Sequence, residues 1–283
     1  MKFRILALCL PALLALGGCG GDDTSTPETP GEVEVVFNLN VGGTPLQPLS
    51  TDATTYTSPS GTKYGISGLR FVISDVRLHS DTGKDVTLAS VHYFDFDVAA
   101  TRTIQASAPH ENYTGMSFTF GLDAGKNLRD KYPITVIPDV MFWPLDLGAD
   151  LGYHYMQIEG NYEKTGGGTG PYTTHTGGRH LDGTSLAYPG VVDATAYHFN
   201  FPVNLSFTPA HIHEGGHGLV VISFDLNGWY MDHTPADGVD TQYDFNSLAN
   251  QMIMGNLDAQ GKLRTNGPGC FTATMTVHGG QDD

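Results

Sequence analysis

Hydrophobic and polar residues alternate with a period of two in several segments of this 283-residue chain. Residues 33–41 are the clearest case, because every odd-numbered position from Val33 to Val41 is apolar and falls on one face of an extended strand. The same alternation predicts six further strands, over residues 69–78, 117–122, 153–160, 199–207, 219–226 and 271–277.

Glycine-rich turns separate these strands, at residues 81–84, 166–168, 214–216 and 267–269. The pattern predicts an all-β fold: an antiparallel β-sandwich or barrel-like domain with long Gly-rich loops and little helix. One short helix is predicted over residues 244–255, where Phe245, Leu248 and Met252 fall on one face. No repeat or change of composition divides the chain, so residues 33–283 are expected to form a single β-rich metal-binding domain.

The first 32 residues are expected to lie outside this domain. Lys2 and Arg4 precede an apolar stretch, residues 5–16, that is too short for a stop-transfer helix. It ends at Leu16-Gly17-Gly18-Cys19, which resembles the lipobox of bacterial lipoproteins. Residues 1–18 are therefore predicted to be a lipoprotein signal peptide and Cys19 the lipidated N-terminus, with an ordinary secretory signal cut nearby as the alternative. Residues 19–32, rich in Thr, Pro and Asp, are predicted to be a disordered tether.

The predicted location follows from the same segment. Gly20 stands where an Asp usually retains lipoproteins at the inner membrane, so the protein is expected at the outer membrane, held only by its lipid anchor, on the periplasmic face or the cell surface. Once Lys2 and Arg4 leave with the signal, 12 basic residues face 30 acidic ones, a formal charge of −18. This charge excludes a nucleic-acid partner and favours cations.

The positions of the cysteines and the absence of catalytic motifs restrict the disulfide bonds and the activities that we expect. Cys9 lies in the signal and Cys19 takes the lipid, so Cys270 has no partner for an intramolecular disulfide and is expected to be a small buried hydrophobe. No nucleophile elbow, phosphate loop or catalytic carboxylate pair is present, so the protein is not expected to be an enzyme.

The densest chemical signal is a group of three histidines, His211, His213 and His217. In an extended strand His211 and His213 point to the same face, and Gly215 and Gly216 then let the chain turn so that His217 approaches the same place. Neutral imidazole suits copper and zinc, so these three residues are candidate metal ligands. Solvated histidines at a polar hairpin tip are the alternative.

A second constellation combines residues 141–162, MFWPLDLGADLGYHYMQIEGNY, with His175 in a Gly/Thr-rich stretch. These residues resemble the MbnP-type copper-binding proteins, a family related to CorA and MopE of methane-oxidising bacteria. Residues 64–88, 113–123 and 271–280 resemble further strands of that family, so the resemblance covers most of residues 33–283. Read without it, Trp143 before Pro144 is a packing residue at a strand edge and His175 is an exposed loop histidine.

The resemblance implies an exported protein that binds copper through histidine and a kynurenine. The kynurenine forms by oxidation of a tryptophan, performed by a di-haem MbnH-type peroxidase-like partner. Carried over to this chain, Trp143 is the candidate kynurenine and His175 a metal ligand, with Trp229 as the alternative modified residue. Leu145 stands where a relative would have a histidine, which puts the exact ligand set in doubt.

The sequence therefore predicts a copper-binding lipoprotein that sequesters or delivers copper without turnover of its own. The alternative is a calcium-stabilised β-sandwich for adhesion or glycan binding, since Asp237, Asp240 and Asp244 form an acidic loop. A copper-dependent redox enzyme would need an open coordination position and a substrate cleft, and neither is evident from the sequence.

Overall fold

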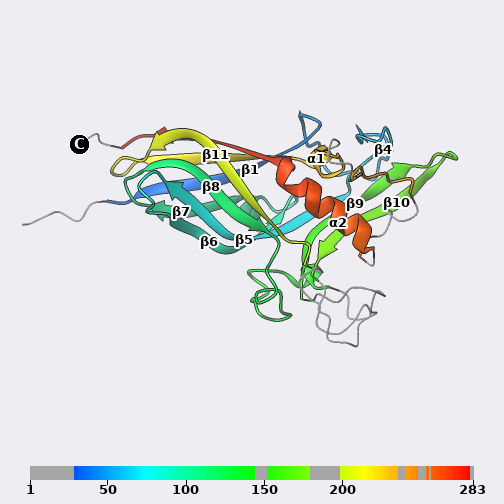
Figure 1. Cartoon of the computed structure of the whole chain (residues 1–283), viewed down its shortest axis with the longest axis horizontal. Helices are drawn as coiled ribbons and strands as arrows, with labels where there is room; N and C mark the ends of the chain where they lie inside the picture. Colours follow the sequence, from blue (N-terminus) through cyan, green and yellow to red (C-terminus); the bar gives the residue numbers. More distant parts are fainter. Residues whose placement is uncertain are drawn as a thin grey trace, which may run out of the picture.

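Two β-sheets form the scaffold of the described chain (Figure 1). The computed structural model describes residues 29–143, 152–178, 198–234, 240–247, 253–254 and 256–280. The predicted all-β class is confirmed, and all seven predicted strands form. The first sheet contains β13 (Phe271–His278), β12 (His217–Asp225), β1 (Gly31–Val41) and β2 (Thr44–Pro45) in that order, with β7 (Thr103–Ala108) also paired to β1.

The second sheet carries the elements that matter most for function. Its order is β11 (Phe201–His211), β8 (Asn112–Phe120), β5 (Gly68–Ser80), β9 (His154–Glu163), β4 (Lys63–Tyr64) and β3 (Tyr56–Thr57). Two further strands join it, β6 (Val86–Asp95) beside β5 and β10 (Thr169–Gly177) beside β9. The β9–β10 hairpin extends to the end of the molecule away from the C-terminus (Figure 1).

One strand pair departs from the antiparallel expectation. β1 and β12 pair in parallel, from Glu32 beside His217 to Asn40 beside Asp225. Parallel neighbours need a long crossover, and here the whole second sheet separates the two strands in sequence. Alternation within a strand shows which face is buried but not the direction of its neighbour, so the pattern did not reveal this pair.

Aromatic rings in edge-to-face contact join the two sheets. Phe71 of β5 stacks on Phe94 of β6 with ring centroids 4.4 Å apart. It also meets Phe37 of β1 edge-on at 5.5 Å and Phe224 of β12 at 5.8 Å, which are strands of the other sheet. Phe71 is completely buried, so its ring is a shared centre of the core.

β5 contains a bulge and pairs with both β9 and β8. Residues 68–71 pair with β9, whereas residues 73–80 pair with β8, and the register shifts between Ser74 and Arg77. Asp75 sits in the shift with φ of 54°, and its carboxylate pairs with the Lys126 ammonium. Bulges bend a strand and increase its twist, and this one marks the point where β9 replaces β8 beside β5.

The described residues contain little helix, and the sequence pattern predicted one helix at the wrong position. The helices are α1 (Leu226–Trp229) and α2 (Leu257–Asn266), with 3₁₀ turns η1 (Ala99–Thr101), η2 (Asp139–Met141) and η7 (Gly267–Cys270). The predicted helix over 244–255 is wrong where it is described, because residues 245–247 form a turn and 253–254 are not helical. Phe245 is instead buried against Tyr64 and Tyr172, so its apolar spacing reflects core packing. The helix begins later, where the Asn256 side chain accepts a hydrogen bond from Ala259 N–H.

Only some of the predicted boundaries between signal peptide, tether and domain fall within the described residues. β1 begins at Gly31, two residues inside the predicted tether, while residues 1–28, with Cys19 and the signal peptide, lie outside the described residues. Within the described part of the chain, no helix has the length and apolar character needed to cross a bilayer.

Replacing Phe71 by Ala is expected to lower the free energy of unfolding by about 3–5 kcal/mol, because it opens a cavity between both sheets. Chemical denaturation with an unchanged m-value measures this loss. Val98→Ala is the control, since Val98 is 45% exposed and its truncation should change stability by less than about 0.5 kcal/mol. Similar stabilities for the two variants would contradict the assignment of Phe71 to the shared core.

Candidate metal centre

The segment that carries Trp143 runs beside the start of β9. Phe142 forms an isolated bridge with Tyr153, and Trp143 N–H donates to the Gly152 carbonyl at 2.9 Å. Arg129 fastens the segment from the other side: its guanidinium donates to the Trp143 carbonyl at 2.6 Å and stacks over the Phe142 ring. Trp143 is consequently 1% exposed, with its indole held against the β9–β10 hairpin.

One histidine packs against this indole, and a second histidine packs against the first. His154, the first residue of β9, has its ring centroid 4.7 Å from that of Trp143 and 5.0 Å from that of His175 on β10. Thr176 and Gly177 interrupt the hairpin register, so that Gly177 rather than the next residue pairs with His154. Such irregularities re-aim side chains, and this one lies directly between the two histidines. Residues 169–177, expected to be a loop, are therefore a strand, and His175 is buried.

Gly177 makes the close approach of the indole possible. A Cβ atom at this position would lie far inside van der Waals contact of Trp143 Cζ3 and Cε3. The β10 backbone therefore forms the floor on which the indole lies.

Three of the four ring nitrogens of the two histidines have polar partners among the described residues. Nδ1 of His154 lies 3.1 Å from both the Met141 carbonyl and the Gln157 amide nitrogen, and its Nε2 lies 3.4 Å from Met254 Sδ. Nε2 of His175 lies 3.1 Å from Oε1 of Glu159 and donates to it. Nδ1 of His175 is buried and has no hydrogen-bond partner among the described residues, and the same holds for Trp143 Nε1.

The electrostatics keep one imidazole neutral. Burial, reinforced by the neighbouring His175, lowers the pKa of His154 to about 3, so its ring is uncharged at neutral pH. The hydrogen bond from His175 lowers the pKa of Glu159 below its usual value, which keeps that carboxylate ionised. Neutral imidazoles whose second nitrogen is bonded to a carbonyl or a carboxylate are the usual form of histidine metal ligands.

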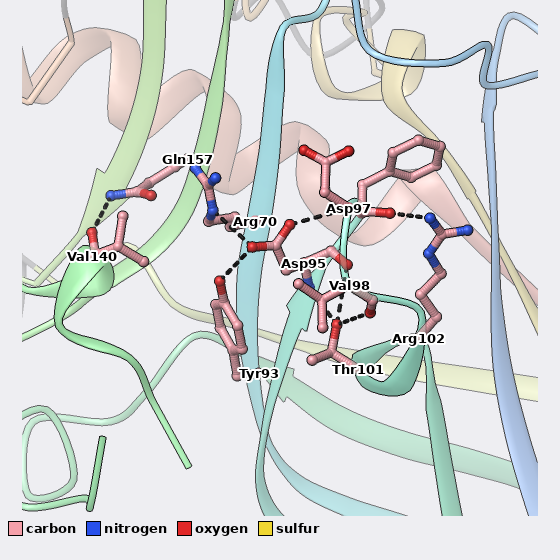
Figure 2. Close-up of polar contacts among 10 residues, drawn as sticks. Arg70, Tyr93, Asp95, Asp97, Val98, Thr101, Arg102, Val140 and Gln157 are labelled. Atoms are coloured by element: carbon pink, nitrogen blue, oxygen red, sulfur yellow. Dashed lines mark hydrogen bonds and ion pairs between the residues drawn. The ribbon is translucent and has the colours of Figure 1, made fainter. Parts of the chain in front are cut away.

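Further polar contacts connect side chains of β5 and β6, away from the histidines. The Arg70 guanidinium donates to Asp95 at 2.9 Å, and the Tyr93 hydroxyl donates to the same carboxylate oxygen at 2.8 Å (Figure 2). The charge of Arg70 also contributes to the lowered pKa of Glu159. On the opposite side, the Gln157 amide donates to the Val140 carbonyl at 2.9 Å and ties β9 to η2 (Figure 2).

The histidines of the predicted hairpin cluster are only partly brought together. The rings of His211 and His213 lie 4.7 Å apart, as the alternation implied. His217 begins β12, and its Nε2 lies 3.9 Å from a carboxylate oxygen of Glu34. Among the described residues, no group of three or more His, Cys, Asp or Glu side chains is arranged to hold a metal ion. The metal role of His211, His213 and His217 stays a prediction.

The other sequence candidates fall in different surroundings. Trp229 is buried in the aromatic core, with its ring 4.9 Å from Phe120 and 5.7 Å from Phe224. Asp240 and Asp244 each accept a hydrogen bond from a backbone N–H two residues ahead, while Asp237 lies outside the described residues. Cys270 is free and buried, as predicted.

Sequence reasoning missed His154 and Met254. His154 stands in the quoted Gly-Tyr-His-Tyr block, but it was given no role. The available signal was its position beside the residue that bridges the Trp143 segment. Met254, whose sulfur lies 3.4 Å from His154 Nε2, carries no local pattern that marks it.

The fold and this site define an all-β protein with a buried candidate metal centre built from two histidines, a tryptophan and a methionine. A family model, MbnP, matches residues 30–253. The chain therefore belongs to the MbnP family, as the sequence resemblance indicated.

One solved structure is similar to the chain: MbnP from Methylosinus trichosporium, with 18% sequence identity and a TM-score of 0.45, over 70% of this chain and 76% of that one. No curated protein matches the chain by sequence.

Replacing Gly177 by Ala is expected to lower the free energy of unfolding by about 1–3 kcal/mol and to displace the indole, because the added methyl group overpacks the contact with Trp143. Tryptophan fluorescence and thermal unfolding measure both effects. Gly166→Ala is the matched control, since Gly166 lies in the turn of the same hairpin with open space around its Cα. An unchanged fluorescence spectrum in Gly177→Ala would contradict the packing described above.

Proposed function

We propose that this protein is an exported lipoprotein that binds copper and sequesters or delivers it, with no turnover of its own. In this proposal His154 and His175 are copper ligands, and the third ligand is a kynurenine formed from Trp143. The observation that carries the proposal is the contact of two buried histidine rings beside the Trp143 indole, with Nδ1 of His175 buried and without a hydrogen-bond partner among the described residues.

The donor set fits copper. Imidazole nitrogen suits copper in both common oxidation states, and both histidines are held by partners typical of ligating imidazoles. Trp143 Nε1 is buried without a hydrogen-bond partner among the described residues, and as a donor only it offers a metal nothing. Opening the indole to kynurenine would supply an aryl amine and a ketone oxygen at the same position, both able to bind a metal.

Each neighbouring residue has a defined task in this proposal. The Met141 carbonyl and the Glu159 carboxylate orient the two imidazole rings. Gly177 and Arg129 position Trp143, and the burial of all three rings excludes water from the ligands. The outcome is a site prepared before the metal arrives, which lowers the reorganisation needed on binding.

Trp143 rather than Trp229 is proposed as the modified residue. Both indoles are buried, but only Trp143 lies against a histidine, whereas Trp229 lies among phenylalanines. A di-haem peroxidase-like partner would supply the oxidation. Attachment through a lipid on Cys19 would place the protein at the outer membrane, where it meets copper before the metal enters the cell.

His154→Gln and His175→Gln are each expected to weaken copper binding by more than roughly tenfold, since even residues outside the ligand shell commonly change metal affinity by this factor. Chelator competition measures the affinity, and circular dichroism checks the fold. The matched control is His211→Ala with His213→Ala, which leaves this centre intact. A separate loss of stoichiometry in that control would assign a second copper site to the hairpin. Full affinity in both Gln variants would overturn the proposed centre.

Protein from the source organism, or produced together with its oxidising partner, is expected to carry kynurenine at position 143. The tryptic peptide should have lost one carbon and gained one oxygen relative to the sequence, with new near-ultraviolet absorbance. Trp229 provides an internal control, because it should remain intact in the same digest. Intact tryptophan at 143 in copper-loaded protein would contradict the proposal.

A further inference from the structure

Two histidines of the first sheet lie side by side on neighbouring strands. His217 begins β12 and His278 ends β13, and the strand register places them directly opposite each other. Directly opposite residues of antiparallel strands point to the same face of the sheet, with Cβ atoms about 4.5–5.5 Å apart. Gly218 is buried, whereas His217 is half-buried and His278 exposed, so both imidazoles stand on the outer face of this sheet.

The next strand adds carboxylates to the same face. Glu32 of β1 is the register partner of His217, and Glu34 follows on the same side of β1. One carboxylate oxygen of Glu34 lies 3.9 Å from Nε2 of His217, which is too long for a hydrogen bond. Two ligand atoms about 2.1 Å from one tetrahedral ion are themselves about 3.4 Å apart, so a small rotation of either side chain would let both atoms bind the same ion.

The surface is hollowed beside these residues. A cavity of about 270 Å³ is lined by residues of three strands, among them Glu32, Gln105, Ser107 and His217. The side chains of His217 and Glu34 are 41% and 28% exposed, so an ion bound here would keep water among its ligands. The hollow stands toward the end of the molecule where the C-terminus lies, whereas the β9–β10 hairpin of the buried centre extends toward the other end (Figure 1).

We propose that His217, His278 and Glu34 form a second metal site, for a divalent transition ion such as Zn²⁺, that joins strands β1, β12 and β13. This site is independent of the proposed function and of the buried centre. Histidine and carboxylate are common zinc ligands, with water in the fourth position of a site that has three protein ligands. The three donors are not already arranged around one point, so binding would proceed by rotation of side chains on a fixed sheet. The grouping differs from the sequence expectation, which placed His217 with His211 and His213.

The test measures Zn²⁺ binding to the full chain by isothermal titration calorimetry, for wild type and for the His217→Ala, His278→Ala and Glu34→Gln variants. Each variant is expected to bind Zn²⁺ at least roughly tenfold more weakly, since even the loss of a residue outside the ligand shell commonly has this effect. These positions lie on the outer face of the sheet, so thermal unfolding of the zinc-free variants should match wild type. The matched control is His211→Ala with His213→Ala, which removes two histidines just before β12 and keeps the three ligands.

Zn²⁺ is also expected to raise the midpoint of thermal unfolding of wild type and of a His154→Gln, His175→Gln double variant, because an ion that binds only the folded protein stabilises it. The same addition should leave the midpoints of His217→Ala and His278→Ala unchanged. Full Zn²⁺ affinity in His278→Ala would overturn the proposed site, and so would a loss of binding confined to the matched control, which would assign the ion to the segment before β12. Zn²⁺ binding that disappears in the double variant would show that only the buried centre takes the ion, and would likewise overturn the proposal.

Discussion

The close packing of the Trp143 indole on the β10 backbone at Gly177 is the contact on which the rest of the centre depends. It places the indole against His154, and the register irregularity at the same residue brings His154 to His175. Gln260 uses the Gly177 N–H to fix the segment that carries Met254. The Trp143 indole and the Gln260 amide thus meet the β10 backbone at one glycine, and a side chain there would occupy the space of the indole.

The two-sheet scaffold gives this contact its rigidity. β9 is held by β5 on one side and β10 on the other, and the bulge around Asp75 frees part of β5 to pair with β9. The phenylalanine core between the sheets fixes β5 in turn, through Phe71. The charged groups follow the same strands: Glu159 on β9 orients His175, and Arg70 on β5 bridges toward Asp95. The orientation of the two histidines is therefore a consequence of strand pairing rather than of loop conformation.

Charge acts at two scales in this molecule. The whole chain carries a formal charge of −16, which raises the local concentration of cations around it. The centre itself is built from groups without charge, since burial keeps His154 neutral and the nearest carboxylate, Glu159, is paired with His175. The acidic chain therefore attracts cations in general, whereas selection between them would rest, in the proposed function, on the buried imidazoles.

The sequence by itself determined the all-β class, the seven main strands and the family, because alternation with period two and the Trp143 block are local features. The sequence also predicted Trp143 and His175 as site residues, but it did not show which residues surround them. Only the tertiary structure decided that residues 169–177 pair as a strand, that His154 turns toward His175, and that Met254 reaches the same place. The parallel β1–β12 pair and the site of α2 were likewise settled by packing. The physical reason is common to all of them: register, bulges and contacts between distant segments depend on which backbone groups pair across the fold, and no local pattern of residues records that choice.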